Sequence, residues 1–115
     1  MTTIKEDYCS KEIYRLLIKK RFDGEVHTTF DKEGYTQPSI TLQMAMKWLR
    51  EVHNLCIEIY VIKNYDKKIC EYTYTIMDLN FPGSDDGIEC CNEYETYEQA
   101  CEAAIKYCLE NLILK

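Results

Sequence analysis

The spacing of the hydrophobic residues changes abruptly near the middle of the chain. Up to residue 52 they recur every three or four positions, which is the spacing of one helix face. The residues on this face are Leu42, Ala45, Trp48, Leu49 and Val52. From Leu55 to Val61 every second residue is apolar, which is typical of a strand with one buried face. The pattern predicts a helix that passes into a strand through Asn54, a residue that tolerates the left-handed conformation.

A shorter helix is expected over residues 10–22, where Ser10 is a suitable N-cap. Its apolar face consists of Ile13, Leu16 and Leu17. Gly24 is expected to take the left-handed conformation that ends this helix. The three basic residues 19–21 fall in its last turn, where cations complement the helix dipole, so we interpret them as a solvated helix end.

The remaining segments predict strands and a closing helix. Residues 25–36 are β-prone around a turn at 31–34, which favours a hairpin. Residues 69–79 alternate and are expected to pair antiparallel with residues 55–63, and residues 88–94 are expected to add an edge strand. Thr96 and Gln99 form a capping-box pattern at the start of the last helix. Its apolar face consists of Tyr97, Cys101, Ala104, Ile105, Cys108 and Leu112. The expected fold is α+β, with an antiparallel sheet of three to five strands packed against three helices.

Composition agrees with one globular domain, residues 1–115, because 46% of the residues are apolar and 30% are charged. The apolar runs are far shorter than the ~20 residues that span a bilayer. The first residues lack the apolar segment of a signal peptide. We therefore expect a cytoplasmic protein that does not enter the membrane.

Negative charge is concentrated in the second half of the chain. Residues 1–63 hold ten Lys or Arg and nine Asp or Glu, residues 64–115 hold four and eleven, and the net charge is −6. A nucleic-acid-binding surface would be basic, so no direct nucleic-acid binding is expected. The carboxylates between residues 78 and 98, where no basic residue occurs, are Asp78, Asp85, Asp86, Glu89, Glu93, Glu95 and Glu98. An alternative function follows from them: an acidic surface that mimics nucleic acid and inhibits a host DNA-binding protein.

The seven cysteines do not indicate disulfides or a metal site. Their number is odd and no Cys-x-x-Cys pair occurs, so we interpret them as thiols that pack as small hydrophobic groups. The four glycines are not spaced for a phosphate-binding loop, and no Cys–His pair shows the pattern of a nucleophile and its base. We expect no cofactor, no metal and no enzymatic activity.

Tyrosine is the one residue type in excess, with ten copies. A domain of this size is not expected to bury all of them with their hydroxyls paired, and exposed tyrosines are typical of protein interfaces. We expect a contact surface at Tyr60, Tyr72 and Tyr74 on the sheet. The other interpretation is ordinary strand composition, since tyrosine is also a preferred strand residue.

The segment from Pro38 to Asn54, and above all its close in Trp-Leu-Arg-Glu-Val-His-Asn at residues 48–54, resembles a family of small uncharacterised proteins. These proteins are encoded by gut anaerobic bacteria, their prophages and mobile elements. The closing helix, which begins with Tyr-Glu-Gln-Ala at residues 97–100, matches as well. The Thr-Gln usual after the proline is replaced here, which leaves Ser39 and Thr41 as alternative caps. The resemblance implies an accessory protein of a phage or mobile element and supplies no catalytic residue.

Together these patterns predict a non-enzymatic, cytoplasmic factor that binds another protein. The partner is unidentified, and self-association stays open beside it.

Overall fold

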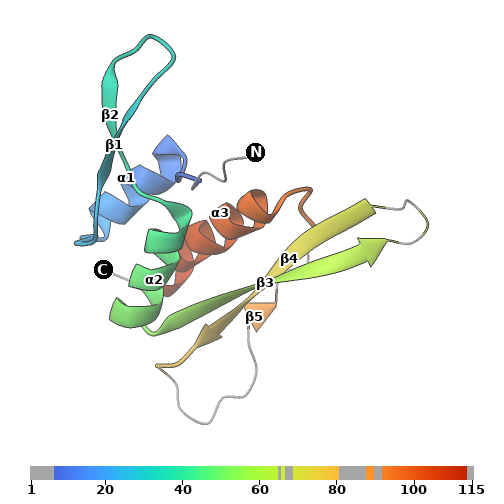
Figure 1. The fold of residues 1–115 in the computed structure, drawn as a ribbon. Coiled ribbons are helices and arrows are strands. Elements are labelled where there is room, and N and C mark those ends of the chain that lie inside the picture. Colours follow the sequence, from blue (N-terminus) through green and yellow to red (C-terminus); the bar gives the residue numbers. More distant parts are fainter. Residues whose placement is uncertain (1–6, 65, 67–68, 81–87, 90–91, 114–115) are drawn as a thin grey trace.

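The computed structural model describes residues 7–64, 66, 69–80, 88–89 and 92–113 (Figure 1). It is an α+β fold with three α-helices, as expected. In chain order the elements are α1 (Lys11–Lys19), β1 (His27–Phe30), β2 (Thr36–Ser39), α2 (Leu42–Val52), β3 (Leu55–Asn64), β4 (Ile69–Asp78), β5 (Ile88–Glu89), α3 (Tyr97–Tyr107) and η1 (Cys108–Leu112). The last of these is a π-helical segment that continues α3.

The strands form two antiparallel sheets, so the expectation of one sheet with three to five strands is matched only in part. One sheet is the β1–β2 hairpin and the other has the order β3-β4-β5. The chain after β2 pairs with the segment before α1: the Cys9 N–H donates to the Ile40 carbonyl at 2.8 Å, and Tyr8 forms a bridge with Thr41. This pairing holds the first hairpin beside α1, apart from the β3–β4 hairpin (Figure 1).

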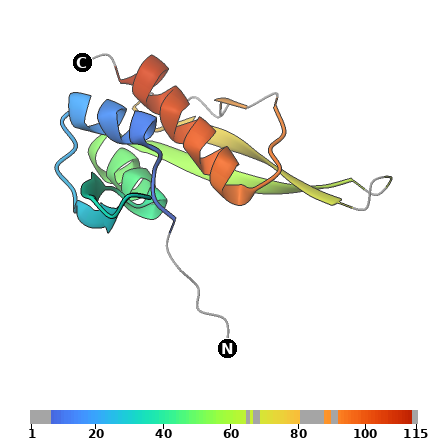
Figure 2. The same ribbon diagram turned by 90° about the horizontal axis from the view of Figure 1, so that it is seen from above.

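The hydrophobic core lies between the helices and one face of the β3–β4 hairpin (Figure 2). The four helical segments and the strands β3 and β4 each contribute at least one fully buried side chain to this core. The largest of these fully buried residues include Leu17, Leu49, Leu55, Ile76, Ile105 and Leu109. Most residues predicted for the three helix faces therefore meet in one place, where burial of apolar surface stabilises the fold. Val52 and Tyr97, which were also predicted for these faces, are exposed.

The helix starts agree with the sequence signals. Ser10 accepts a hydrogen bond from the Ile13 N–H, and Thr41 accepts one from the Met44 N–H, so Thr41 is the cap of α2. Thr96 and Gln99 form the complete capping box of α3. Each cap satisfies an N–H group that has no partner within its helix.

The end of α1 differs from the prediction. Arg21, not Gly24, takes the left-handed conformation, with a φ of 67°. The Phe22 N–H then donates to the Leu17 carbonyl at 3.0 Å, which turns the Phe22 side chain into the core. Gly24 has a different role, since a Cβ at this position would lie 2.5 Å from the Phe22 ring. The prediction was wrong because the burial of Phe22 places the left-handed residue at Arg21, three residues before the glycine.

The third strand of the second sheet is shorter than predicted. Residues 88–94 were expected to form it, whereas β5 covers Ile88–Glu89. Tyr94 pairs separately with Tyr72 through two backbone hydrogen bonds of 2.8 and 2.7 Å. Both pairings lie on the side of β4 that faces away from β3.

Arg21→Gly should stabilise the protein. Replacement removes the steric cost of a left-handed L-residue, about 1–2 kcal/mol, and part of this gain is lost to the greater freedom of glycine in the unfolded chain. We expect a net gain of up to about 1 kcal/mol in the free energy of unfolding, measured by denaturant titration. The matched control is Lys19→Gly inside α1, which should cost about 1 kcal/mol. If both variants lost the same amount of unfolding free energy, the assignment of backbone strain to Arg21 would be wrong.

Candidate functional site

The structure does not bring the three predicted contact tyrosines onto one surface. Tyr60 lies opposite Thr73, whereas Tyr72 lies opposite Val61 and Tyr74 opposite Ile59. Directly opposite residues of an antiparallel pair share a face, and neighbours along a strand alternate between faces. Tyr72 and Tyr74 therefore belong to the face turned toward the helices, and Tyr60 belongs to the other face.

The tyrosines on the helix-facing side take part in packing. Tyr74 is only 7% exposed and stacks on Tyr94, with ring centroids 6.3 Å apart. Tyr72 meets the edge of Tyr97 at the start of α3, at a centroid distance of 6.2 Å. Tyr60 is 43% exposed, and its hydroxyl donates to the Glu58 carboxylate at 2.7 Å.

A more continuous feature is the outer edge of β3. This strand has ten residues and ends the β3-β4-β5 sheet, and no strand of the described residues pairs with its outer side. The half of the hairpin nearer its turn projects beyond α3 (Figures 1 and 2). Val61, in this half, is 57% exposed. Long apolar edge strands are surfaces on which another strand can pair.

The ladder geometry identifies the backbone groups that point outward from this edge. The Leu79 N–H donates to the Asn54 carbonyl at 2.9 Å, which makes this a hydrogen-bonded pair. Such pairs alternate with non-hydrogen-bonded ones. Tyr72 directs its N–H and carbonyl to Tyr94, which agrees with this alternation, since its β3 neighbour is Val61. The backbone N–H and carbonyl groups that point away from β4 consequently belong to Leu55, Ile57, Ile59 and Val61.

The predicted acidic residues lie in separate places where they are described. Asp78, at the end of β4, accepts hydrogen bonds from the backbone and side chain of Asn80 at 3.0 and 2.8 Å. Glu93, Glu95 and Glu98 lie near the other end of β4, around the bridge from Tyr94 to Tyr72 and the first turn of α3. Asp85, Asp86 and the side chain of Glu89 lie outside the described residues. A continuous acidic surface stays a prediction.

Three described thiols are buried in the core. Burial raises the pKa of Cys9 and of Cys108 to about 12 and that of Cys101 to about 11, so all three are protonated at neutral pH. Within the described part of the chain, no group of three His, Cys, Asp or Glu residues is arranged to hold a metal ion. These thiols pack as apolar groups and are not poised as nucleophiles.

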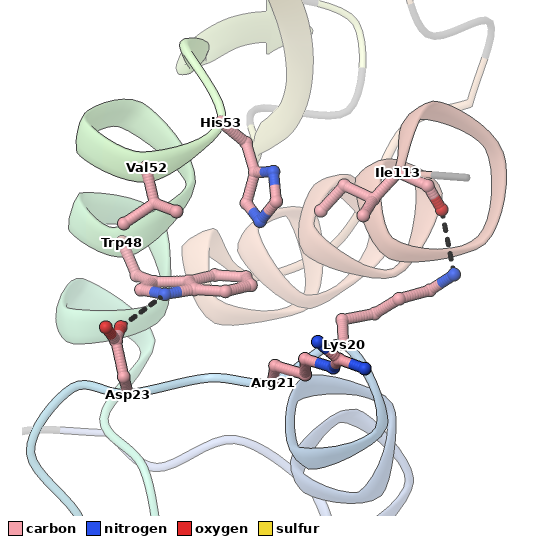
Figure 3. A pocket seen from close by; sticks show the side chains of 7 residues that line it. All are labelled: Lys20, Arg21, Asp23, Trp48, Val52, His53 and Ile113. Atoms are coloured by element: carbon pink, nitrogen blue, oxygen red, sulfur yellow. Dashed lines mark hydrogen bonds between the residues drawn. The ribbon is translucent and has the colours of Figure 1, made fainter. Parts of the chain in front are cut away.

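A cavity of about 530 Å³ lies where the ends of α1 and α2 meet the last described residue (Figure 3). Its lining consists of Lys20, Arg21, Asp23, Trp48, Val52, His53 and Ile113. The Trp48 indole N–H donates to the Asp23 carboxylate at 2.9 Å, and the Lys20 ammonium donates to the Ile113 carbonyl at 2.8 Å. The Lys20 side chain, just after α1, is thereby tied to the backbone at Ile113.

His53 forms the upper wall of the cavity in Figure 3, with one ring nitrogen directed toward Trp48. The two rings meet edge to face, with centroids 4.6 Å apart and planes at 73°. The buried Nε2 atom has no hydrogen-bond partner among the described residues. A neutral imidazole that carries its proton on Nε2 would direct it at the indole ring, a weak but favourable contact. Burial lowers the pKa of His53, which favours this neutral form at pH 7.

Only part of this cavity could be predicted from the sequence. The basic residues 19–21 were interpreted as a solvated helix end, yet Lys20 and Arg21 line the cavity. Asp23 and Ile113 are ninety residues apart in the chain and show no motif that would join them. The one local hint was a tryptophan on α2 followed, five positions later, by a histidine at the C-cap of this helix.

Among the described residues, no helix has both the length and the apolar character needed to cross a bilayer. Comparison of the chain with protein-family models, curated proteins and solved structures finds no match.

Lowering the pH should destabilise the fold through His53. A histidine with a lowered pKa in the folded state binds its proton more readily when unfolded, so its contribution to stability is present above pH 6.5 and is lost as the pH falls toward the folded-state pKa. Urea unfolding at several pH values should show a decline below pH 6.5 that is smaller in His53→Gln. His27→Gln, at a position outside the cavity, is the control. An unchanged pH profile in His53→Gln would contradict this role.

The buried thiols should resist modification in the native protein. Peptide mapping after a short maleimide treatment at pH 7 should find Cys9, Cys101 and Cys108 unmodified, and full modification after unfolding in urea. Cys56, which is only half-buried, serves as the internal reference and should react before these three. Rapid native labelling of any of the three buried thiols would show a reactive site that burial does not explain.

Proposed function

We propose that this chain is a non-enzymatic binding factor that accepts an extended segment of a partner protein along the outer edge of β3. The observation that supports this most directly is the row of outward-facing backbone groups on a ten-residue strand at the end of the sheet. Strand addition supplies affinity through main-chain hydrogen bonds and specificity through the side chains that alternate beside them.

The sequence of β3 suits this mode of binding. Its first eight residues are rich in isoleucine, valine and other β-prone types, and they include neither proline nor lysine, two residues that commonly protect edges. Lys63 lies near the turn, and Glu58 is the one charged residue before it. The side chains of Tyr60 and Val61 are both largely exposed beside the edge and could cover an added strand.

Charge indicates the character of the partner. Glu58 on β3 is exposed, and the chain as a whole carries a net charge of −6. An added strand with lysine or arginine side chains would complement this field, which mainly accelerates association and sets specificity. The proposed partner is thus a protein with an extended, basic segment.

The wider setting rests on the resemblance of residues 38–54 and 97–100 to proteins of gut bacteria, prophages and mobile elements. On this basis the proposed role is that of a cytoplasmic accessory factor of a phage or mobile element. The buried, protonated thiols favour a binding role over nucleophilic catalysis.

Val61→Pro tests the proposal because it changes the edge without breaking the hairpin. The Val61 N–H points away from β4, so proline removes an outward donor and no β3–β4 hydrogen bond. Partner captured by the tagged wild-type chain from a lysate of the cells that encode it should bind Val61→Pro about tenfold more weakly. Val61→Thr, which keeps both the N–H and a β-branched side chain, is the matched control and should bind normally.

Circular dichroism should confirm that both variants keep the fold. Equal binding of the partner by Val61→Pro and Val61→Thr would reject the edge as the docking site. A wild-type dimer in sedimentation that dissociates in Val61→Pro would assign the edge to a second copy of the chain instead of a different protein.

A further inference from the structure

We propose that the cavity between the ends of α1 and α2 is a binding site for a small organic monocarboxylate. This inference does not depend on the proposed function of the β3 edge, because Val61 lies six residues, or about 20 Å, along the strand from its start beside the cavity. The argument rests on the apolar walls, on one uncommitted arginine and on the charge balance of the lining.

The walls can accommodate the apolar body of a ligand. Trp48, Val52 and Ile113 line the cavity, and Val52 is 52% exposed at its rim. In Figure 3 the indole, the imidazole and the Ile113 side chain surround an open space above Arg21. A volume of about 530 Å³ is within the range of small-molecule sites, which are mostly apolar with a few polar groups.

Arg21 supplies the polar group that would recognise a carboxylate. Arg21 is exposed where it lines the cavity, and its guanidinium forms no ion pair or hydrogen bond with any residue in the described part of the chain. The planar guanidinium can donate two parallel hydrogen bonds to the two oxygens of a carboxylate. Arg21 is also held in the left-handed conformation, and non-glycine residues in such conformations concentrate at functional sites.

The charges of the lining favour one negative charge in the ligand. Lys20 and Arg21 are cationic, Asp23 is anionic, and His53 is favoured in its neutral form, which leaves a net charge of +1. A monocarboxylate would neutralise this charge. A phosphate dianion would exceed it and would place its second charge near Asp23.

The site is held in shape before a ligand arrives. Asp23 fixes the Trp48 indole through a hydrogen bond, while Phe22 and His53 contact the same indole at centroid distances of 5.4 and 4.6 Å. Lys20 is tied to the Ile113 carbonyl. Preorganised walls reduce the entropic cost of binding, so even a small ligand can bind measurably.

Trp48 provides the measurement, since it is the single tryptophan of the chain and part of the wall. Titration of the full chain with phenylacetate should change its fluorescence and saturate with a dissociation constant on the order of 1 mM, as expected for about ten heavy atoms. Phenylacetamide, which has the same shape without the charge, should bind at least about tenfold more weakly. Arg21→Gln should weaken phenylacetate binding by the same factor, whereas Lys19→Gln, a cation outside the lining, should not.

Four results would overturn the inference. Equal binding of acid and amide would remove the carboxylate as the recognised group, and undiminished binding by Arg21→Gln would remove Arg21. No binding of either phenylacetate or hexanoate at about ten times the expected dissociation constant would remove the site. Inorganic phosphate that binds more tightly than both acids would reject the monocarboxylate in favour of a dianion.

Discussion

The turn at Asn54 is the constraint on which the rest of the structure depends. Asn54 takes the left-handed conformation with a φ of 56°, and its carbonyl accepts the Leu79 N–H. Asn80 closes the same turn by donating to the His53 carbonyl at 2.8 Å. This small group of bonds joins the end of α2 to both strands of the hairpin. It sets the ladder alternation that decides which groups of β3 point outward, and it places the His53 ring over Trp48.

Much of the fold could be predicted from local signals. The helix caps, the change of period at Asn54 and the antiparallel pairing of the two long strands each depend on residues close in sequence, where propensity and periodicity are informative. The error at Gly24 shows the limit of such signals. Glycine is the usual residue at a helix end, but here the burial of Phe22 decides the position, and Arg21 accepts the strained conformation.

The candidate sites could be predicted less well because they depend on register and on distant segments. The alternation within each strand shows which neighbours of Tyr60 and of Tyr72 share its face, but it does not relate one strand to the other. Only the pairing of Tyr60 with Thr73 reveals that Tyr60 and Tyr72 lie on opposite faces of the sheet. A change of register by one residue would have reversed this result. The cavity likewise joins the end of α1, the end of α2 and Ile113, and the division of the strands between two sheets follows from pairing of the chain ahead of α1 with residues 40–42.

The position of Ile113 in the far wall of the cavity depends on the winding of the π-helical segment before it. Ile113 donates its N–H to the Cys108 carbonyl, five residues back, so the segment contains one residue more than an α-helix of the same extent would need. Winding the same residues as an α-helix, with none removed, would rotate everything beyond them by about 100°. The carbonyl that holds Lys20 would turn away with it. The position of this carbonyl therefore depends on the winding of the segment more than on any one of its side chains.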